Sequence, residues 1–174
     1  MYLISIYFDV KTNRKIQQYI DKVAEKTGNT FMLDGNVPPH ITISAFETLN
    51  EKCAIEALEY AIEKLRKGKV EWVSVGQFFP YVIFLEPVLN QYLYDICVCV
   101  NQELSNVASI KISPYYQPFQ WLPHTTIAKK LSKEEMRIAF EVLQESFGMF
   151  EGEVVKIGLA KPNPHRDIAT WELR

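Results

Sequence analysis

The sequence has no long apolar run. Nothing in its 174 residues approaches the roughly 20 consecutive apolar residues that a membrane-spanning helix needs. The apolar N-terminus, residues 1–9, has neither a basic leader nor a small-residue cleavage site, so it is interpreted as a strand and not as a signal peptide. We therefore expect no membrane association and a cytoplasmic location.

Cysteine is also scarce. The three cysteines, Cys53, Cys97 and Cys99, have no metal-binding spacing, and an odd count fits a reduced, cytoplasmic chain. We expect all three to pack on helices, and we expect neither a metal nor a cofactor.

A surplus of basic residues is missing as well. The formal net charge is −2, whereas proteins that grip long nucleic acid usually carry a basic excess. A nucleotide or an RNA end is therefore the expected partner, and a long duplex is not. The near-neutral charge and the lack of an obvious exposed apolar helix favour a monomer.

Apolar residues, in contrast, are abundant: 48% of the chain is hydrophobic and 13% is aromatic. This composition predicts a well-filled core and argues against disorder. The length fits one sizeable domain or two small fused lobes, and no linker or low-complexity segment divides the chain. Residues 1–174 are therefore predicted to form a single two-lobed domain.

Residue periodicity predicts four helices and seven strands. The helices run from a cap at Thr12 or Asn13 to about Lys26 with a stop at Gly28, from an Asn50 cap to Gly68, over residues 91–107, and from a Ser132–Glu135 capping box to Gly148. The strands cover residues 2–10, 40–46, 70–79, 81–86, 124–130, 154–159 and 168–173, and residues 111–123 form an aromatic loop.

The order of these elements repeats. From His40, and again from His124, the order is strand, helix, strand, strand, and the two starting points lie 84 residues apart. This repeat predicts an α+β fold of two pseudo-symmetric lobes. Each lobe would have a mostly antiparallel sheet with outer helices, and each would contribute one histidine to a cleft between them.

Each repeat begins with a similar motif. The first is Pro39-His40-Ile41-Thr42-Ile43-Ser44 and the second is Pro123-His124-Thr125-Thr126-Ile127-Ala128. Side chains alternate along a strand, which predicts one shared face for His40, Thr42 and Ser44, and likewise for His124 and Thr126. Each strand would then hold an imidazole beside a hydroxyl.

Two imidazoles suit phosphodiester cleavage because they titrate near neutrality. One can accept a proton from the attacking oxygen while the other donates a proton to the leaving oxygen. The hydroxyls of Thr42, Thr126 and Ser44 are candidates to bind the non-bridging phosphate oxygens. The sequence does not distinguish the acid from the base.

Other interpretations of the histidines exist. A single His-x-Thr on a strand is more often a core or surface feature than a catalytic one. Two histidines also open a zinc site, which would need a third ligand, and neither motif strand contains Asp or Glu. Two such motifs at matching positions favour the catalytic interpretation.

The paired motifs, above all Trp121-Leu122-Pro123-His124-Thr125-Thr126-Ile127-Ala128, resemble the 2H phosphoesterase superfamily and its bacterial 2′-5′ RNA ligase-like branch. The resemblance implies catalytic roles for His40 and His124 and phosphate contacts for Thr42 and Thr126. It implies an activity on 2′,3′-cyclic phosphates or 2′-5′ linkages. The second motif departs from the fuller His-x-Thr-x-Ser pattern, since Ala128 replaces the serine.

Residues flanking the second motif are weaker candidates. By strand alternation Lys130 shares the His124 face and is a candidate phosphate contact, whereas Lys129 points away. Trp121, Phe119 and Tyr115 are candidates to stack a base, although packing of this loop on the core is the alternative.

The third histidine lies in the turn-prone segment Asn163-Pro164-His165-Arg166. His165 is interpreted as a surface residue and Arg166 as a candidate phosphate contact. The leading hypothesis for the chain is a cyclic phosphodiesterase or 2′-5′ RNA ligase-like hydrolase. The alternative is a non-catalytic nucleotide- or RNA-binding module on the same fold.

Overall fold

The computed structural model describes residues 1–162 and 165–174. Its helices are α1 (Val10–Thr27), α2 (Phe31–Asp34), α3 (Glu51–Lys64), α4 (Gln91–Ser105) and α5 (Lys133–Ser146), with a 3-10 turn η1 (Pro114–Tyr116). Its strands are β1 (Tyr2–Phe8), β2 (His40–Glu47), β3 (Gly68–Phe78), β4 (Val82–Pro87), β5 (Lys111–Ile112), β6 (Thr125–Ala128), β7 (Phe150–Lys161) and β8 (Arg166–Glu172).

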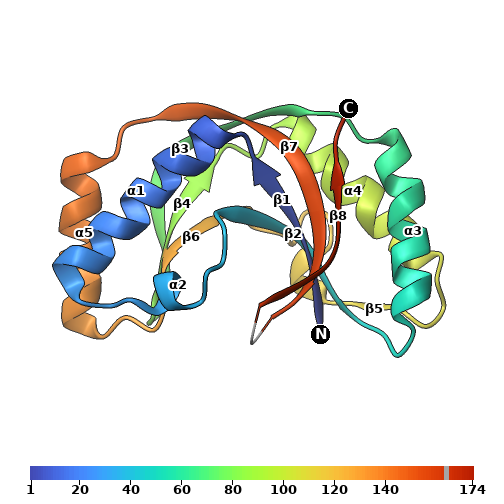
Figure 1. Cartoon of the computed structure of the whole chain (residues 1–174), viewed down its shortest axis with the longest axis horizontal. Coiled ribbons are helices and arrows are strands. Elements are labelled where there is room, and N and C mark those ends of the chain that lie inside the picture. Colours follow the sequence, from blue (N-terminus) through green and yellow to red (C-terminus); the bar gives the residue numbers. More distant parts are fainter. Residues whose placement is uncertain (163–164) are drawn as a thin grey trace.

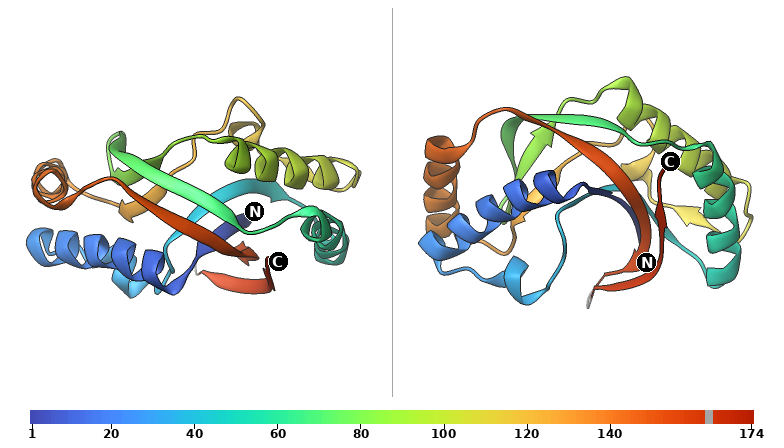
Figure 2. Two further views of the ribbon diagram at one scale, coloured as in Figure 1. Left: turned by 90° about the horizontal axis from the view of Figure 1, so that it is seen from above. Right: turned by 45° about the horizontal axis from the view of Figure 1, so that its top comes forward.

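The strands form one sheet in the order β5-β2-β1-β7-β3-β4-β6, and β8 also pairs with β7. Every pairing is antiparallel. The helices gather at the two ends of the sheet, with α1 and α5 at one end and α3 and α4 at the other (Figures 1 and 2). The predicted α+β fold with a mostly antiparallel sheet and outer helices is confirmed.

The two repeats exchange their hairpins. The strand that begins at His40, β2, pairs with β1, which pairs with β7. The β3–β4 hairpin of the same repeat pairs instead with β6, the strand that follows His124. The histidine strand of each repeat therefore lies in the same end of the sheet as the hairpin of the other repeat.

Aromatic rings fill the core where the two ends of the sheet join. Trp72 of β3 is fully buried, stacks on Phe150 at a centroid distance of 4.8 Å and meets Phe8 edge-on at 4.9 Å. Its indole N–H donates to the Thr125 hydroxyl at 3.1 Å, so the polar atom of the ring is satisfied. This packing fixes β6 against β3 directly beside the second motif.

The start of α1 differs from the prediction. The cap is Asp9, whose carboxylate accepts from the Thr12 backbone N–H at 3.0 Å, and Thr12 lies in the first turn. An aspartate preceding the helix satisfies the free N–H groups better than a residue inside the first turn can. The predicted stop is confirmed: Gly28 has a φ of 75° and its N–H donates to the Ala24 carbonyl.

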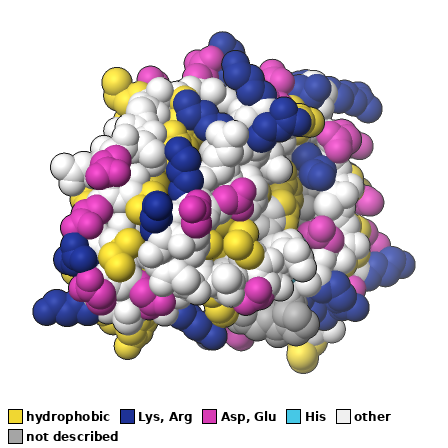
Figure 3. Space-filling view, turned by 60° about the vertical axis from the view of Figure 1, so that its left-hand side comes forward, with side chains coloured by type: hydrophobic (Ala, Val, Ile, Leu, Met, Phe, Trp, Pro, Cys, Tyr) yellow, Lys and Arg dark blue, Asp and Glu magenta, His cyan; other side chains and the backbone are white. Residues whose placement is uncertain are grey.

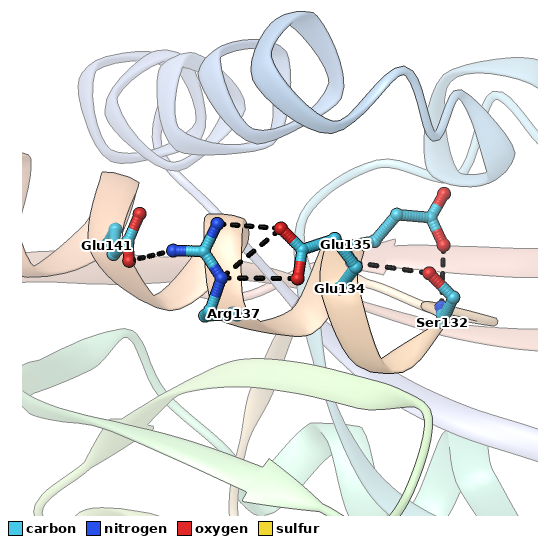
Figure 4. A network of polar contacts seen from close by, with 5 residues as sticks. All are labelled: Ser132, Glu134, Glu135, Arg137 and Glu141. Carbon is cyan, nitrogen blue, oxygen red and sulfur yellow. Dashed lines mark hydrogen bonds and ion pairs between the residues drawn. The ribbon is translucent and has the colours of Figure 1, made fainter.

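Helices α1 and α5 form the outer surface of one end of the molecule, and their solvent faces carry charges of both signs (Figure 3). The predicted capping box at the start of α5 is confirmed. The Ser132 hydroxyl accepts from the Glu135 N–H, and the Glu135 carboxylate accepts from the Ser132 N–H (Figure 4).

The remaining differences concern short or extended elements. The four-residue α2, the two-residue β5 and η1 were not predicted, because they are too short to show a periodic pattern. Helix α3 ends at Lys64 and not at Gly68, which begins β3. Strand β7 begins at Phe150 because its first residues pair with β3 and the following ones with β1. The three cysteines lie on α3 and α4 as free thiols.

Candidate active site

His40 and His124 are anchored in the same way. The Nδ1 atom of His40 lies 2.8 Å from the carbonyl oxygen of Pro38, and the Nδ1 atom of His124 lies 2.9 Å from that of Leu122. A carbonyl can only accept, so each Nδ1 carries the proton and donates it to the residue two positions earlier. The neutral ring then has an unprotonated Nε2, which is free to exchange protons with a substrate.

An aromatic ring lies beside each histidine, and a glycine makes room for each ring. The Phe84 ring lies 5.3 Å from the His124 ring, and a Cβ on Gly76 would come within 2.3 Å of Phe84. The Tyr7 ring lies 6.2 Å from the His40 ring, and a Cβ on Gly158 would come within 2.8 Å of Tyr7. These rings can lie flat on the sheet only because the neighbouring strand lacks a side chain there.

The histidines and Lys129 act on one another electrostatically. The pKa of His40 is lowered to about 4, mainly by burial and in part by the charges of His165, His124 and Lys129, while the hydrogen bond to the Pro38 carbonyl acts in the raising direction. The pKa of His124 is also lowered, by burial and by the charge of Lys129. Because β2 also contacts β6, the structure brings His40, His124 and Lys129 into one region.

The threonines of the two motifs lie in different surroundings. Thr42 is buried, and its hydroxyl lies 3.4 Å from that of Ser5 on β1. Thr126 is half-buried and pairs with Phe84 of β4. Its neighbour Thr125 faces the core, as alternation predicts.

Ser44 does not share the face of His40 and Thr42, and this expectation requires correction. The register of β1 against β2 shifts so that Ser44 pairs with Ile4 and Thr42 with Ser5, which leaves Ile43 as an extra residue. Such a bulge reverses the alternation beyond it. Ser44 is fully buried, and its hydroxyl donates to Asn101 of α4 at 2.8 Å.

The strand alternation from which the orientation of Lys130 was expected does not reach that residue. Strand β6 ends at Ala128, and Lys130 has a φ of 57°, so alternation does not continue to it. The Lys130 ammonium lies 4.4 Å from the centre of the Phe31 ring. Lys129, which was expected to point away, is the lysine whose charge acts on both histidines.

The three aromatic candidates separate into two groups. Trp121 is only 7% exposed, and its indole N–H donates to the Thr42 carbonyl at 3.0 Å, so it ties the second motif to the first strand. Phe119 and Tyr115 are 82% and 78% exposed. A further exposed ring was missed: Phe78, 37% exposed, meets the His124 ring edge-on at 4.8 Å.

His165 was also missed as a member of this region. Asn163 and Pro164 of the predicted turn lie outside the described residues, but the His165 side chain is only 19% exposed and its Nε2 lies 3.2 Å from Asp167. It is therefore not the surface residue that was expected. Asp167 in turn lines a cavity of about 440 Å³ together with Tyr7, which pairs with His40, and Pro38, whose carbonyl accepts from the His40 ring. No local pattern in the sequence indicated this proximity, which arises from the pairing of β8 with β7.

Two kinds of site have no counterpart in the described part of the chain. No group of three His, Cys, Asp or Glu residues within residues 1–162 and 165–174 is placed to hold a metal ion. The zinc alternative thus lacks a ligand set there. Over the same ranges, no helix is long and apolar enough to cross a membrane.

Comparison with known proteins gives a family and a fold. The profile of the 2'-5' RNA ligase superfamily matches residues 12–166. No sequence among curated proteins matches significantly. The E. coli LigT structure complexed with 3'-AMP is 12% identical, with a TM-score of 0.64 over 99% of this chain and 97% of that one. A structure described as a phosphoesterase gives the same values. LigT complexed with ATP is 13% identical, with a TM-score of 0.57 over 99% and 96% of the two chains.

Proposed function

The chain belongs to the 2'-5' RNA ligase superfamily, and from this premise we propose that it is a metal-independent phosphoesterase acting on 2′,3′-cyclic phosphates or 2′-5′ phosphodiesters of RNA type. The observation that carries the proposal is the matched anchoring of His40 and His124, each through Nδ1 to a main-chain carbonyl. This arrangement presents two equivalent Nε2 atoms for proton transfer, as general acid–base cleavage requires.

We assign the roles of the two histidines from their different surroundings. His40 has a pKa of about 4 and is neutral at pH 7, so it acts as the base. Its Nε2 takes a proton from water as the water oxygen bonds to phosphorus. His124 acts as the acid: the negative charge of a bound phosphate raises the pKa of both histidines, and fewer positive charges oppose protonation at His124 than at His40. Its Nε2 gives a proton to the ribose oxygen as the bond from phosphorus to that oxygen breaks.

Charge on the phosphate is stabilised by groups from both motifs. We assign phosphate contacts to the hydroxyls of Thr42 and Thr126, which follow the two histidines by two positions. We assign Lys129, whose charge lowers the pKa of both histidines, as the cation that attracts the substrate, in preference to Lys130, whose ammonium lies over the Phe31 ring. Ser44, bonded to Asn101 in the core, is not part of this set.

A nucleoside is the group that the phosphate carries. The partly exposed Phe78 ring beside His124 offers a surface on which a base can stack. Phe119 and Tyr115 remain exposed candidates for the same contact. Structural relatives described as LigT complexed with 3'-AMP, ATP and NADP+ bind nucleotides, which supports a nucleotide or RNA-end substrate.

The test is turnover of the four nucleoside 2′,3′-cyclic monophosphates and of 2′-5′-linked dinucleotides in the presence of EDTA. We expect hydrolysis of at least one class, unaffected by the chelator. Micromolar binding of these compounds without turnover would contradict the proposal and favour the non-catalytic binding module. Activity that is lost in EDTA and restored by a metal would contradict the metal-independent mechanism.

A further inference from the structure

A stripe of basic side chains follows the outer face of α1. It lines a groove of about 660 Å³ that also touches the last turn of α5 at Ser146. The spacing of three, four and seven positions places these residues on one face of the helix. The basic members are Lys11, Arg14, Lys15 and Lys22, and the groove is completed by Val10, Gln18 and Tyr19.

The basic residues of the stripe are not held in ion pairs. Within the part of the chain that the structure describes, no ion pair joins its four basic residues to Asp or Glu. Lys15 lies over the Phe150 ring at 4.4 Å, and Asp21 of the same helix accepts from Gln17. In a protein of net charge −2, the four basic residues of the groove are a local concentration of positive charge.

The groove adjoins the region of His40. Val10 lines both the groove and the cavity of about 440 Å³ that reaches Tyr7 and Pro38. Tyr7 pairs with His40, and the Pro38 carbonyl accepts from its Nδ1. His40 itself does not line the cavity, but a ligand that extends from His40 past Tyr7 and Pro38 enters it and reaches Val10, where the basic stripe begins.

The cavity and the groove differ in charge. Three acidic residues, Asp9, Asp167 and Glu172, and one basic residue, Lys156, line the cavity, which suits ribose hydroxyls and base amino groups as hydrogen-bond donors. The groove carries only cations among its charged residues, which suits phosphates. A chain that places a nucleoside in the cavity and its phosphates along the groove fits this distribution of charge.

We propose that the groove binds the phosphate backbone of a single-stranded RNA whose end lies at His40 and His124, an inference that rests on the proposed function. The substrate is then an RNA end and not a free mononucleotide. A lipid surface fits less well, because the basic residues line a concave groove in which Val10 is the one strongly exposed apolar side chain.

The test is binding of fluorescein-labelled hexauridylate with a 3′-phosphate, followed by anisotropy at several salt concentrations. The variant replaces Lys11, Arg14 and Lys22 by glutamine. The matched control replaces Lys52, Lys67 and Lys111, three exposed lysines outside the groove, and changes the net charge by the same amount. Circular dichroism confirms that both fold.

We expect the groove variant to bind the RNA at least about tenfold more weakly than the wild type. The slope of log K against log salt should become shallower by about 2, because three phosphate contacts are lost. The control variant should bind with the affinity and the slope of the wild type. Equal binding by the groove variant and the control would overturn the proposal. Loss of binding to phosphatidylserine-containing vesicles, with RNA binding unchanged, would overturn it in favour of a lipid surface.

This measurement is independent of turnover. If the wild type binds hexauridylate through the stripe but hydrolyses none of the cyclic or 2′-5′ substrates, the proposed function is contradicted and RNA binding by the groove is supported. If cyclic mononucleotides are hydrolysed and the groove variant binds RNA as tightly as the wild type, only the proposal about the groove is contradicted.

Discussion

Each end of the sheet holds one histidine against an aromatic ring, but the side chains around the two histidines differ. Around His40 the supporting ring is Tyr7, a phenol held beside the charges of Lys156 and Asp167. Around His124 the supporting rings are Phe84 and Phe78, which carry no polar atom. The backbone geometry is matched and the environment is not. We infer that pseudo-symmetry positions the two histidines, whereas their surroundings make one the base and the other the acid.

The largest expected effect is the loss of either imidazole. His40→Ala and His124→Ala should each lower kcat by about 10²–10⁴, because a general base and a general acid each contribute on that order. Steady-state kinetics on the best substrate of the panel measures this, with thermal unfolding as a check of folding. If either histidine can be replaced without a loss of kcat, the claim that both ends of the sheet contribute a catalytic imidazole is contradicted.

The two threonines come next. Thr42→Val and Thr126→Val should each reduce kcat/KM by about 10² by removing a hydrogen bond to the charged phosphate. Ser44→Ala is the matched control: its hydroxyl bonds Asn101 in the core, so the variant should lose about 1–3 kcal/mol of stability and keep its kcat/KM. A loss of kcat/KM at Ser44 as large as that at Thr42 would contradict the bulge argument.

Substitution of Gly76 and Gly158 tests whether the aromatic rings beside the histidines position them. Gly76→Ala must displace the buried Phe84 ring beside His124, and Gly158→Ala must displace Tyr7 beside His40. Each should cost about 1–3 kcal/mol of stability from overpacking and should also lower kcat, more so at Gly76, where the approach is closer. Gly148→Ala, which meets nothing within 4 Å, is the control in both assays. Variants that lose stability alone would show that the rings do not position the histidines.

The smallest expected effect distinguishes the adjacent residues Lys129 and Lys130. Lys129→Met should raise KM several-fold, and it should move the acid limb of the pH profile of kcat/KM to higher pH. The sign follows because the positive charge of Lys129 lowers the pKa of both histidines, so that its removal lets them bind protons at higher pH. Lys130→Met, at a residue stacked on Phe31, should change neither quantity. An effect of Lys130→Met on KM and on the pH profile, with none for Lys129→Met, would contradict this assignment and favour Lys130 as the phosphate contact.

Local sequence pattern is informative where the structure depends on local geometry. The His-x-Thr spacing, the Asn50 cap and the Ser132–Glu135 capping box involve residues within a few positions of one another. Element types and an α+β fold follow from periodicity over longer windows, which is why most helices and strands agree with the prediction.

Features made by pairing between distant strands left no such pattern. The bulge at Ile43 depends on the register of β1, and it buries Ser44. Trp121 is buried because its indole reaches the Thr42 carbonyl, 79 positions away. The glycine–aromatic pairs, the exchange of hairpins between repeats and the approach of His165 likewise arise between segments that are far apart in the chain.

The central claim is that both histidines present a neutral Nε2 from an Nδ1–H tautomer, and that His40 resists protonation more than His124. Long-range ¹⁵N–¹H NMR of histidine-labelled protein over a pH titration measures this directly. The account predicts the Nδ1–H tautomer for both rings at pH 7, with His40 titrating to a pKa of about 4 and His124 also below its ordinary 6.5. An Nε2–H tautomer at either residue, or a His40 that is protonated at pH 6, would contradict it.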